Sequence, residues 1–514
     1  MFLVSLPYAV LQGGWAALFS MVGVAYVCCY TGEILVECLY EQCAPNADVS
    51  SCPARARDGM RRASAGGLGA GQAASKTTND DLNAHSNPFA ASNNGGGSSG
   101  SNNPYRQRSS VRVCSPEPMP TTTTSEVTGE ALVRVRHSYA EIAAAVWGAR
   151  FGTLVVNAAQ LLELLMTCIL YLVLCGDLLG GVLEEYVPLG LTAWIVLGGL
   201  PIVPCALLTS LRRMSTLSFW CTVAHLVINA IIFAFCVLRV GDWELRAVQF
   251  FPSVWSFPIA LGIIIFSYTS QIFLPTLEGN MSDTTHFRPM LRWSHGAAAL
   301  CKTLFGLVGF ITFKSATQEV ITNNLPPAVK VAVNAALIAK ALLSYPLPYF
   351  AAVQLIEQWL FLGRERGTRF ASCFSPSGAL TRRALLLRLA LICATIACAV
   401  AIPHFAHLMG LIGSFTGTML SFVWPAYFHL RLRWERLSRT RRALDLFIVA
   451  LGLVAGAVGI FYSSVGLVQV EAAGHAAFTA AEPAHLDAPL PIPIYPKPPK
   501  AVRKAPFLRT LPQR

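Results

Sequence analysis

The sequence predicts an all-α protein that crosses a membrane many times. Of its 514 residues, 54% are hydrophobic and only 13% are charged, whereas a soluble domain carries about 25% charged residues. Apolar runs long enough for a membrane helix recur along most of the chain, with short basic loops between them. One run, Leu261–Met281, is interrupted at its centre by the polar stretch Ser267–Gln271. These observations predict a polytopic membrane protein organised around a broken helix.

Composition argues against several other classes of protein. The net charge of +12 comes mostly from Lys and Arg in short clusters between apolar runs, so we expect no nucleic-acid partner. Many of the 15 cysteines lie inside apolar runs, where Cys behaves as a small hydrophobic residue. We find no metal-ligand spacing and expect neither a metal nor a cofactor. No Ser/His, HExxH or paired-Asp pattern lies inside the apolar runs, so we do not expect an enzyme.

The first apolar region, Met1–Gly32, contains no charged residue and exceeds the length that one helix needs to cross a bilayer of ~30 Å. Gly13-Gly14 divides it. Trp15–Leu39 is a full span, whereas Met1–Gln12 is only half of one, about 18 Å long. We therefore expect the chain to begin within its first membrane helix. A chain that truly starts at Met1 is then expected to lack part of its solute site and to be inactive.

Nine further apolar runs are predicted to be membrane helices. Their limits are Phe151–Cys175, Leu189–Leu211, Thr216–Leu238, Val254–Leu277, Trp293–Phe313, Val329–Ile356, Ala384–Ile402, His404–Tyr427 and Ala443–Leu467. With Trp15–Leu39 they give ten full helices in addition to the truncated first one.

The chain is predicted to have four parts. Residues 1–42 contain the partial first helix and the second helix. Residues 43–127 are rich in Ser, Asn, Gly, Thr and Arg, and we interpret them as a disordered cytosolic insertion or as a mistranslated intron. Residues 128–470 contain helices three to eleven, and residues 471–514 form a Pro-rich lumenal tail.

Basic residues are predicted to lie mainly on one side of the membrane. Arg212-Arg213, the group from Arg364 to Arg383 and the group from Arg431 to Arg442 share that side, while Gly176–Pro188 on the other side has no Lys or Arg. By the positive-inside rule the basic side is cytosolic. The N-terminus is then cytosolic and the C-terminal tail is lumenal.

The polar stretch Ser267–Gln271 is the strongest indication of function. An unpaired polar group in the bilayer core costs several kcal/mol, so a helix interrupted there is typical of one that lines a solute cavity. We interpret the stretch as the part of a secondary transporter that contacts the solute. The alternative is an ordinary span whose hydroxyls bond to its own carbonyls.

Two charged residues lie near the centres of predicted spans. A carboxylate such as Glu163 costs ~2.5–3.5 kcal/mol at that depth on insertion scales, so we predict that it binds and releases the coupling proton. A purely structural Glu is the alternative. The ammonium of Lys340 either stands where a sodium-coupled transporter holds its cation, or is the structural partner of a carboxylate such as Glu163.

Three further charged residues are given mainly structural roles. Arg388 is expected to extend from a helix end to the surface, and the structural interpretation is also preferred for Lys302. Glu278 closes the broken-helix region, where it either caps or gates the break or lies on the surface.

Several motifs occur in a characteristic order along the chain: LPYA, VCCYTGEIL, ELLMTCILYLVL, SYTSQIFLP, KALLSYPLPYFAA and PHFAHLMGL. Together they resemble the amino acid/auxin permease family, and within it the vesicular inhibitory amino acid branch. The resemblance runs from Met1 to about Leu467 and excludes roughly Ala44–Val127. The long insertion and the Pro-rich tail depart from the family pattern.

The resemblance implies the leucine-transporter-like fold, with two inverted five-helix repeats and an eleventh helix. It implies that GABA and glycine are loaded from the cytosol into synaptic vesicles by the proton electrochemical gradient, through alternating access around broken helices one and six. Whether protons are exchanged or chloride is cotransported stays open.

In such a fold, free N–H groups at the half-helix ends are expected to bind the substrate carboxylate. Hydroxyls of Ser267, Tyr268 and Thr269 complete the polar pocket. Ser270 lies beside them, and Phe266 supplies an apolar wall. Two alternatives stay open: a proton-coupled amino acid permease of the plasma or lysosomal membrane, and an amino acid sensor that binds without transport.

Overall fold

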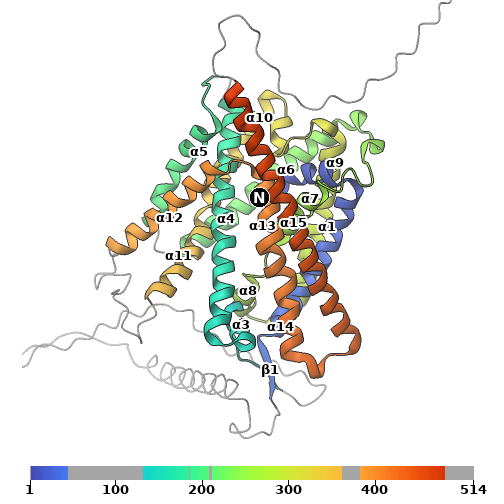
Figure 1. The fold of residues 1–514 in the computed structure, drawn as a ribbon, viewed down its shortest axis with the longest axis vertical. Coiled ribbons are helices and arrows are strands. Elements are labelled where there is room, and N and C mark those ends of the chain that lie inside the picture. The colour runs from blue at the N-terminus through green and yellow to red at the C-terminus, as the bar shows by residue number, and fades with distance from the viewer. Residues whose placement is uncertain (1, 44–130, 184–185, 208–210, 362–381, 481–514) are drawn as a thin grey trace, which may run out of the picture. The chain divides into compact units, whose positions relative to one another are not determined.

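The structure is a computed structural model that describes residues 2–43, 131–183, 186–207, 211–361 and 382–480. Nearly all of the predicted insertion at 43–127 and the tail beyond residue 480 lie outside the described residues. The chain divides into two units, Met1–Leu467 and Val468–Arg514, and the features below belong to the first (Figure 1).

Helices account for almost all of the described residues. The α-helices are α1 (Leu6–Glu37), α3 (Tyr139–Trp147), α4 (Ala149–Leu183), α5 (Leu191–Gly199), α6 (Leu211–Leu238), α7 (Phe257–Tyr268), α8 (Leu274–Gly279), α9 (Phe287–Phe313), α10 (Pro327–Ser344), α11 (Pro346–Phe361), α12 (Arg382–Ala401), α13 (Phe405–Ile412), α14 (Trp424–Arg433) and α15 (Arg439–Ala480). Short 3-10 helices are η1 (Phe2–Ser5), η2 (Leu200–Leu207), η3 (Val240–Asp242), η4 (Leu245–Ala247), η5 (Thr284–His286), η6 (Lys314–Ala316), η7 (Ile321–Asn324) and η11 (Trp434–Arg436), and the π-helical stretches are η9 (Gly413–Gly417) and η10 (Met419–Val423).

The one sheet within the described residues is a two-stranded antiparallel ribbon. It pairs β1 (Tyr40–Cys43) with β2 (Ala131–Arg134), and Tyr40 lies directly opposite Arg134. The ribbon therefore fixes the chain at both sides of the predicted insertion.

The polytopic helical character that the sequence predicts is confirmed. Eight helices of the described chain are long and apolar enough to cross a membrane, and Leu191–Leu207 and Phe257–Tyr268 are shorter apolar helices. Each of the ten predicted full spans overlaps one of these. The number of crossings and the inverted repeat stay predictions.

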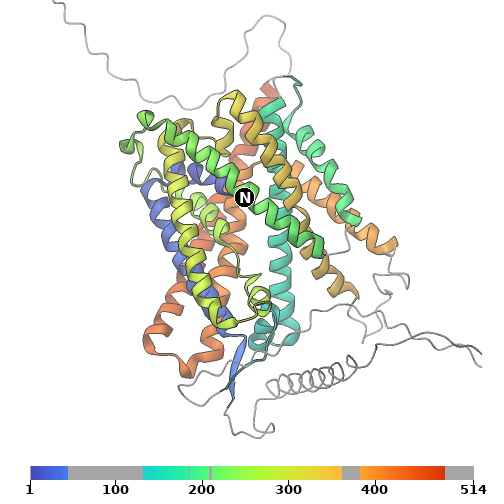
Figure 2. The same cartoon turned by 180° about the vertical axis from the view of Figure 1, so that it is seen from behind.

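The helices of the first unit pack in two groups that meet at the centre of the bundle (Figures 1 and 2). In one group α7 packs against α1 and α13, and α1 also packs against α9 and α14. In the other group α4 packs against α5, α10, α11 and α12. Contacts of α4 with α13 and η9 join the groups, so α4 and α13 form the boundary at which buried polar residues collect.

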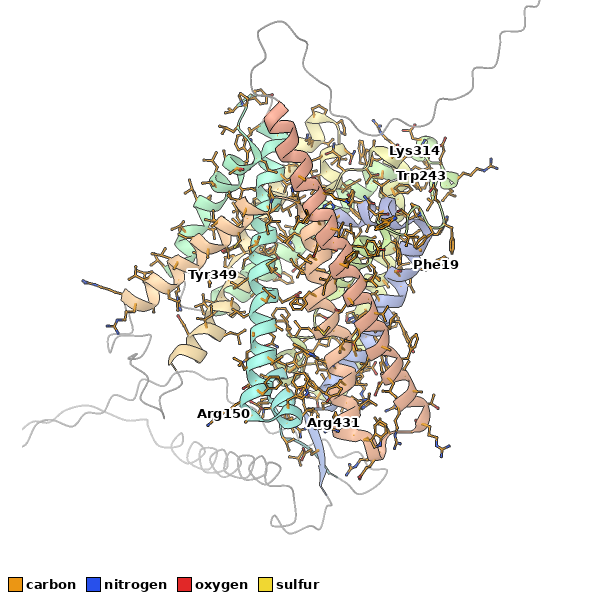
Figure 3. The ribbon with its side chains drawn as sticks, in the orientation of Figure 1. Phe19, Arg150, Trp243, Lys314, Tyr349 and Arg431 are labelled. Carbon is orange, nitrogen blue, oxygen red and sulfur yellow. The ribbon has the colours of Figure 1, made fainter. Side chains whose placement is uncertain are left out.

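Arginines mark one end of the bundle. Arg150 and Arg431 lie at that end, whereas Lys314 and Trp243 lie at the other (Figure 3). This grouping agrees with the loop charges on which the predicted orientation rests, and the orientation itself stays a prediction.

Helix α1 is interrupted at Gly14, where the sequence predicts a division between a half-span and a full span. Gly14 has φ 57° and ψ −142°, a conformation that is essentially restricted to glycine. Beyond it, the N–H of Trp15 donates to the carbonyl of Gln249 at 3.0 Å, and the N–H of Ala16 donates to Phe250 at 3.1 Å. The loop before α7 thus satisfies donors that the interruption leaves free.

Replacing Gly14 by Ala is expected to destabilise the protein by at least about 1–3 kcal/mol, because of the backbone strain. The new Cβ would also collide with the carbonyl of Gln249. Gly23→Ala in the same helix is the matched control, since a Cβ there meets nothing within 4 Å and helical Gly→Ala stabilises by about 0.5–1 kcal/mol. Thermal unfolding of the two purified variants checks this. Equal unfolding temperatures would contradict the role given to the Gly14 interruption.

Candidate functional site

The broken helix is present where the sequence places it. Helix α7 ends at Tyr268 and α8 begins at Leu274, with Pro275 in the first turn of α8. Proline is tolerated there because the first N–H groups of a helix have no intrahelical acceptor. Of the residues between the two helices, Gln271 is buried, Phe273 is exposed and the others are half-buried, so their backbone polar groups need partners from within the protein wherever water is excluded.

Gln271, which is completely buried, makes several hydrogen bonds around the helix break. Its amide nitrogen donates to the carbonyl of Cys28 at 3.2 Å and to the hydroxyl of Thr31 at 3.3 Å, both on α1. Its amide oxygen accepts from the hydroxyl of Ser421 at 2.8 Å and from the N–H of Ser270 at 3.0 Å. One amide therefore joins the helix break to α1 and to η10.

Lys302 of α9 supplies a positive charge at the end of α7. Its Nζ donates to the carbonyl of Ser267 at 2.5 Å and lies 3.5 Å from the ring centroid of Tyr268. An ammonium at a helix C-terminus is stabilised by the free carbonyls there, and the aromatic face adds a cation–π interaction. A structural role is preferred for Lys302 from the sequence, whereas the structure places it against the broken helix.

The hydroxyls of the polar stretch differ in how they are bonded. Those of Ser267 and Thr269 donate to the carbonyls of Ile264 at 2.7 Å and Ile265 at 3.2 Å, as the alternative of an ordinary span supposed. The hydroxyls of Tyr268 and Ser270 are buried and have no hydrogen-bond partner among the described residues. A buried hydroxyl without a partner is costly, so these two are the unpaired donors of the break.

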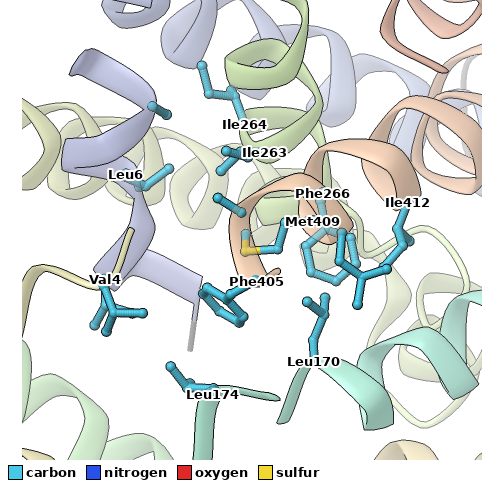
Figure 4. Close-up of a cluster of buried hydrophobic side chains, with 14 of the residues drawn as sticks. Val4, Leu6, Leu170, Leu174, Ile263, Ile264, Phe266, Phe405, Met409 and Ile412 are labelled. Carbon is cyan, nitrogen blue, oxygen red and sulfur yellow. The ribbon is translucent and has the colours of Figure 1, made fainter. Parts of the chain in front are cut away.

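Phe266 lies on the apolar side of the same region. It is 6% exposed and belongs to a cluster with Leu170 of α4 and with Met409 and Ile412 of α13 (Figure 4). Val4, from the segment before Gly14, lies in this cluster too. Side chains of both broken helices thus meet those of α4 and α13.

Glu163 is buried in α4 and is 4% exposed. The hydroxyl of Thr416, in η9, donates to its Oε2. The same π-helical stretch lies against α7, since a Cβ on Gly413 would be 2.9 Å from the Cβ of Phe266 and one on Gly417 would be 3.3 Å from the hydroxyl of Thr269. The structure therefore links Glu163 to the broken helix through a single intervening helix.

Lys340 lies apart from the helix break. It is 7% exposed in α10, which packs against α4 and α6. Glu163 and Lys340 are both among the described residues, and no ion pair joins them there, so the roles suggested for Lys340 stay predictions. The predicted site residues thus fall into the break itself, Glu163 beside it, and Lys340 outside it.

Two expectations for other charged residues are wrong. Arg388 does not extend to the surface: it is 2% exposed and pairs with Glu357 at 3.0 Å. Glu278 is not a surface residue, since it is 1% exposed and pairs with Arg134 at 2.9 Å. Hydropathy gives the depth of a residue, whereas these partners come from other helices and loops.

The sequence analysis missed Thr416 and Ser421, which bond to Glu163 and Gln271. A signal was present: GSFTGTMLSF places four hydroxyl residues in one apolar helix, and all four are buried. π-helical stretches such as η9 and η10 are frequent at functional sites, but the sequence does not reveal them.

Gln271→Leu is expected to destabilise the protein by about 1–3 kcal/mol, because the hydroxyl of Ser421 and the N–H of Ser270 lose their buried acceptor. Gln318→Leu, at an exposed amide, is the matched control and is expected to change stability by less than about 0.5 kcal/mol. Thermal unfolding in the same detergent measures both. A Gln271 variant as stable as the control would show that this amide does not hold the break together.

Comparison with known proteins places the chain among transporters. It matches the family model described as "Transmembrane amino acid transporter protein" over residues 1–49 and 122–468. It is 39% identical over 474 residues to the human protein named "Vesicular inhibitory amino acid transporter", covering 91% of this chain and 74% of the relative.

Similarity extends to more distant organisms. The Caenorhabditis elegans protein named "Vesicular GABA transporter" is 36% identical over 470 residues, covering 91% of this chain and 77% of the relative. The Arabidopsis thaliana protein named "Amino acid transporter AVT1E" is 24% identical over 349 residues, covering 63% of this chain and 61% of the relative. The matched ranges contain both halves of the broken helix, Glu163 and Lys340. The chain therefore belongs to the transmembrane amino acid transporter family.

Proposed function

We propose that this chain is a secondary active transporter that loads GABA and glycine from the cytosol into synaptic vesicles, driven by the proton electrochemical gradient. The names of the human and nematode relatives support the substrate class and the vesicular location. In this proposal the chain is a multi-pass protein of the vesicle membrane with a cytosolic N-terminus and a lumenal C-terminus. Chloride stays a further candidate for the coupling ion.

The observation that carries this proposal is that two buried hydroxyls at a helix break, those of Tyr268 and Ser270, have no hydrogen-bond partner in the described part of the chain. A zwitterionic amino acid offers a carboxylate that accepts hydrogen bonds and an ammonium that donates them. The two hydroxyls bond to the carboxylate, together with free backbone N–H groups of the broken helices. The hydroxyl of Thr269, already donating to a carbonyl, remains an acceptor for the ammonium, whereas that of Ser267 accepts from Lys302 at 3.4 Å. Phe266 covers the methylene groups.

Proton coupling is assigned to Glu163. Its carboxyl group is buried, its one hydrogen-bond donor among the described residues is Thr416, and Thr416 lies on the stretch that packs against α7. Protonation removes the charge that this hydroxyl stabilises, and so changes the packing beside the broken helix. Lys340 supplies a fixed positive charge in α10 for the same cycle, in the place of a mobile cation.

Alternating access in this proposal uses the leucine-transporter-like arrangement of two inverted five-helix repeats. The two groups of helices that meet at α4 and α13 move against each other, and the broken halves α7 and α8 act as separate rigid pieces. The end that carries Arg150 and Arg431 faces the cytosol. The substrate enters from that end and leaves at the other.

Uptake of radiolabelled GABA into proteoliposomes, with an imposed proton gradient and membrane potential, tests the proposal. Wild-type protein is expected to accumulate GABA and glycine. Tyr268→Phe and Ser270→Ala are expected to raise the KM roughly 2- to 10-fold each, since each removes one hydrogen bond worth about 0.5–1.5 kcal/mol. Ser294→Ala is the matched control, because this hydroxyl donates to its own helix at the start of α9.

Other outcomes identify the alternatives. GABA binding without flux contradicts the transporter and supports a sensor. Uptake in whole cells that follows an inward proton gradient, without a vesicular pump, supports a plasma-membrane or lysosomal permease. An unchanged KM in both hydroxyl variants would remove the helix break from the substrate site.

Glu163→Gln is expected to reduce the accumulation of GABA driven by the proton gradient by at least about tenfold, because Gln cannot carry the proton. Exchange of internal for external GABA is expected to persist, since exchange needs no net proton movement. Thr416→Val is the comparison variant, as it keeps the carboxyl group and removes the hydrogen bond. Loss of exchange together with accumulation would mean that Glu163 is structural.

A further inference from the structure

The C-terminal end of α8 is bound by residues of the β1–β2 ribbon. Arg134 of β2 pairs through Nη1 with Glu278 Oε2 at 2.9 Å, and through Nη2 it donates to the carbonyl of Pro275 at 2.8 Å. The hydroxyl of Tyr40, on β1, donates to the other carboxylate oxygen of Glu278. We refer to these three residues, Arg134, Tyr40 and Glu278, as the latch.

The latch geometry follows from the strand register. Tyr40 and Arg134 are directly opposite in an antiparallel pair, so their side chains leave the same face of the ribbon and reach one target together. Gly279 lets the arginine approach, because a Cβ there would lie 2.5 Å from Arg134 Nη1. Burial and the neighbouring Glu278 raise the pKa of the Tyr40 hydroxyl, which keeps it a neutral donor.

The ribbon is itself fixed to the bundle. Arg136 donates to the carbonyl of Cys38 at 2.7 Å, and the N–H of Val135 donates to Leu39 at 2.9 Å. From α14, Arg433 donates to the carbonyls of Glu37 at 2.8 Å and Tyr40 at 3.0 Å. A residue that binds α8 from this ribbon therefore ties it to both α1 and α14.

Apart from the latch, helix α8 is held mainly by Leu274, which is buried in a cluster with Phe287 and Leu291. It spans only six residues, and at its other end the chain is fixed by Gln271. Glu278 carries a nearly fully buried charge, and removing one partner of such a pair leaves an uncompensated charge. The latch also borders a cavity of about 480 Å³ that Arg433 and Arg288 help to line, so release of α8 would open an existing hollow at this end of the bundle.

We propose that Arg134, Tyr40 and Glu278 are the residues that hold the second half of the broken helix closed at the arginine-rich end, and that this contact breaks each time that end opens. The inference rests on the proposed transport function, because it assigns the latch to one step of alternating access. These residues position α8 and do not contact the substrate.

Hydrogen–deuterium exchange of the amides in residues 272–281, in the full chain in lipid nanodiscs, tests the latch without requiring transport. Arg134→Met and Glu278→Gln are each expected to speed exchange there by at least about tenfold, and Tyr40→Phe by a smaller factor. The double variant Arg134→Met/Glu278→Gln is expected to exchange no faster than the faster single variant, because the two residues act as one pair. Glu41→Gln is the matched control, since it removes the Arg136–Glu41 ion pair of the same ribbon without touching α8.

GABA uptake by the same variants separates this inference from the proposed function. We expect Arg134→Met to change the rate of GABA uptake as well as to speed exchange in residues 272–281. Arg134→Lys is expected to restore part of the wild-type uptake rate. Unchanged exchange in both Arg134→Met and Glu278→Gln would overturn the latch even if the wild type transports GABA. Faster exchange with wild-type uptake rates would also overturn it. If hydrogen–deuterium exchange in the variants changes as expected but the wild type transports no GABA, the transport function is overturned. The assignment of the latch to a transport step is then overturned with it.

Discussion

An interrupted helix in a membrane bundle must find partners for every backbone group that the interruption frees, because lipid supplies none. Here Gln271 accepts from the N–H of Ser270, and Lys302 donates to the carbonyl of Ser267. The Gln271 amide also binds Cys28, Thr31 and Ser421. These contacts draw α1, α9 and η10 around the break. The positions of the surrounding helices therefore depend on satisfying this one short stretch.

The position of the break could be predicted from the sequence, since polar residues followed by Pro275 stand out in an apolar run. The ends of the two helices that flank the break could not be predicted. The run Val254–Leu277 was predicted as one span, whereas α7 ends at Tyr268 and α8 is a separate helix. Hydropathy does not mark these ends, because they depend on the partners that the freed backbone groups find. The same limit applies to α15, which continues past the predicted boundary at residue 470 to Ala480.

In the candidate site, too, some features could be predicted from the sequence and others could not. Glu163 stands out because a carboxylate in an apolar run is costly, but its partner Thr416 lies 253 residues further along the chain. For Lys302 the sequence favours a structural role, and only the structure places it over Tyr268. Residue type indicates which side chains need a partner, and tertiary packing alone decides which partner they receive.

Within the break, the bonded and the unbonded polar groups have different consequences for the proposed cycle. Gln271 has its donors and acceptor occupied and therefore holds the two halves of the helix at a fixed distance from α1. Tyr268 and Ser270 have no partner among the described residues, so a solute that binds them relieves a cost rather than displacing an existing bond. In the proposed cycle Glu163 is linked to the same place through η9, which contacts both its carboxylate and α7. If substrate and proton bind as proposed, energetic coupling between them requires only that this helix end have two arrangements.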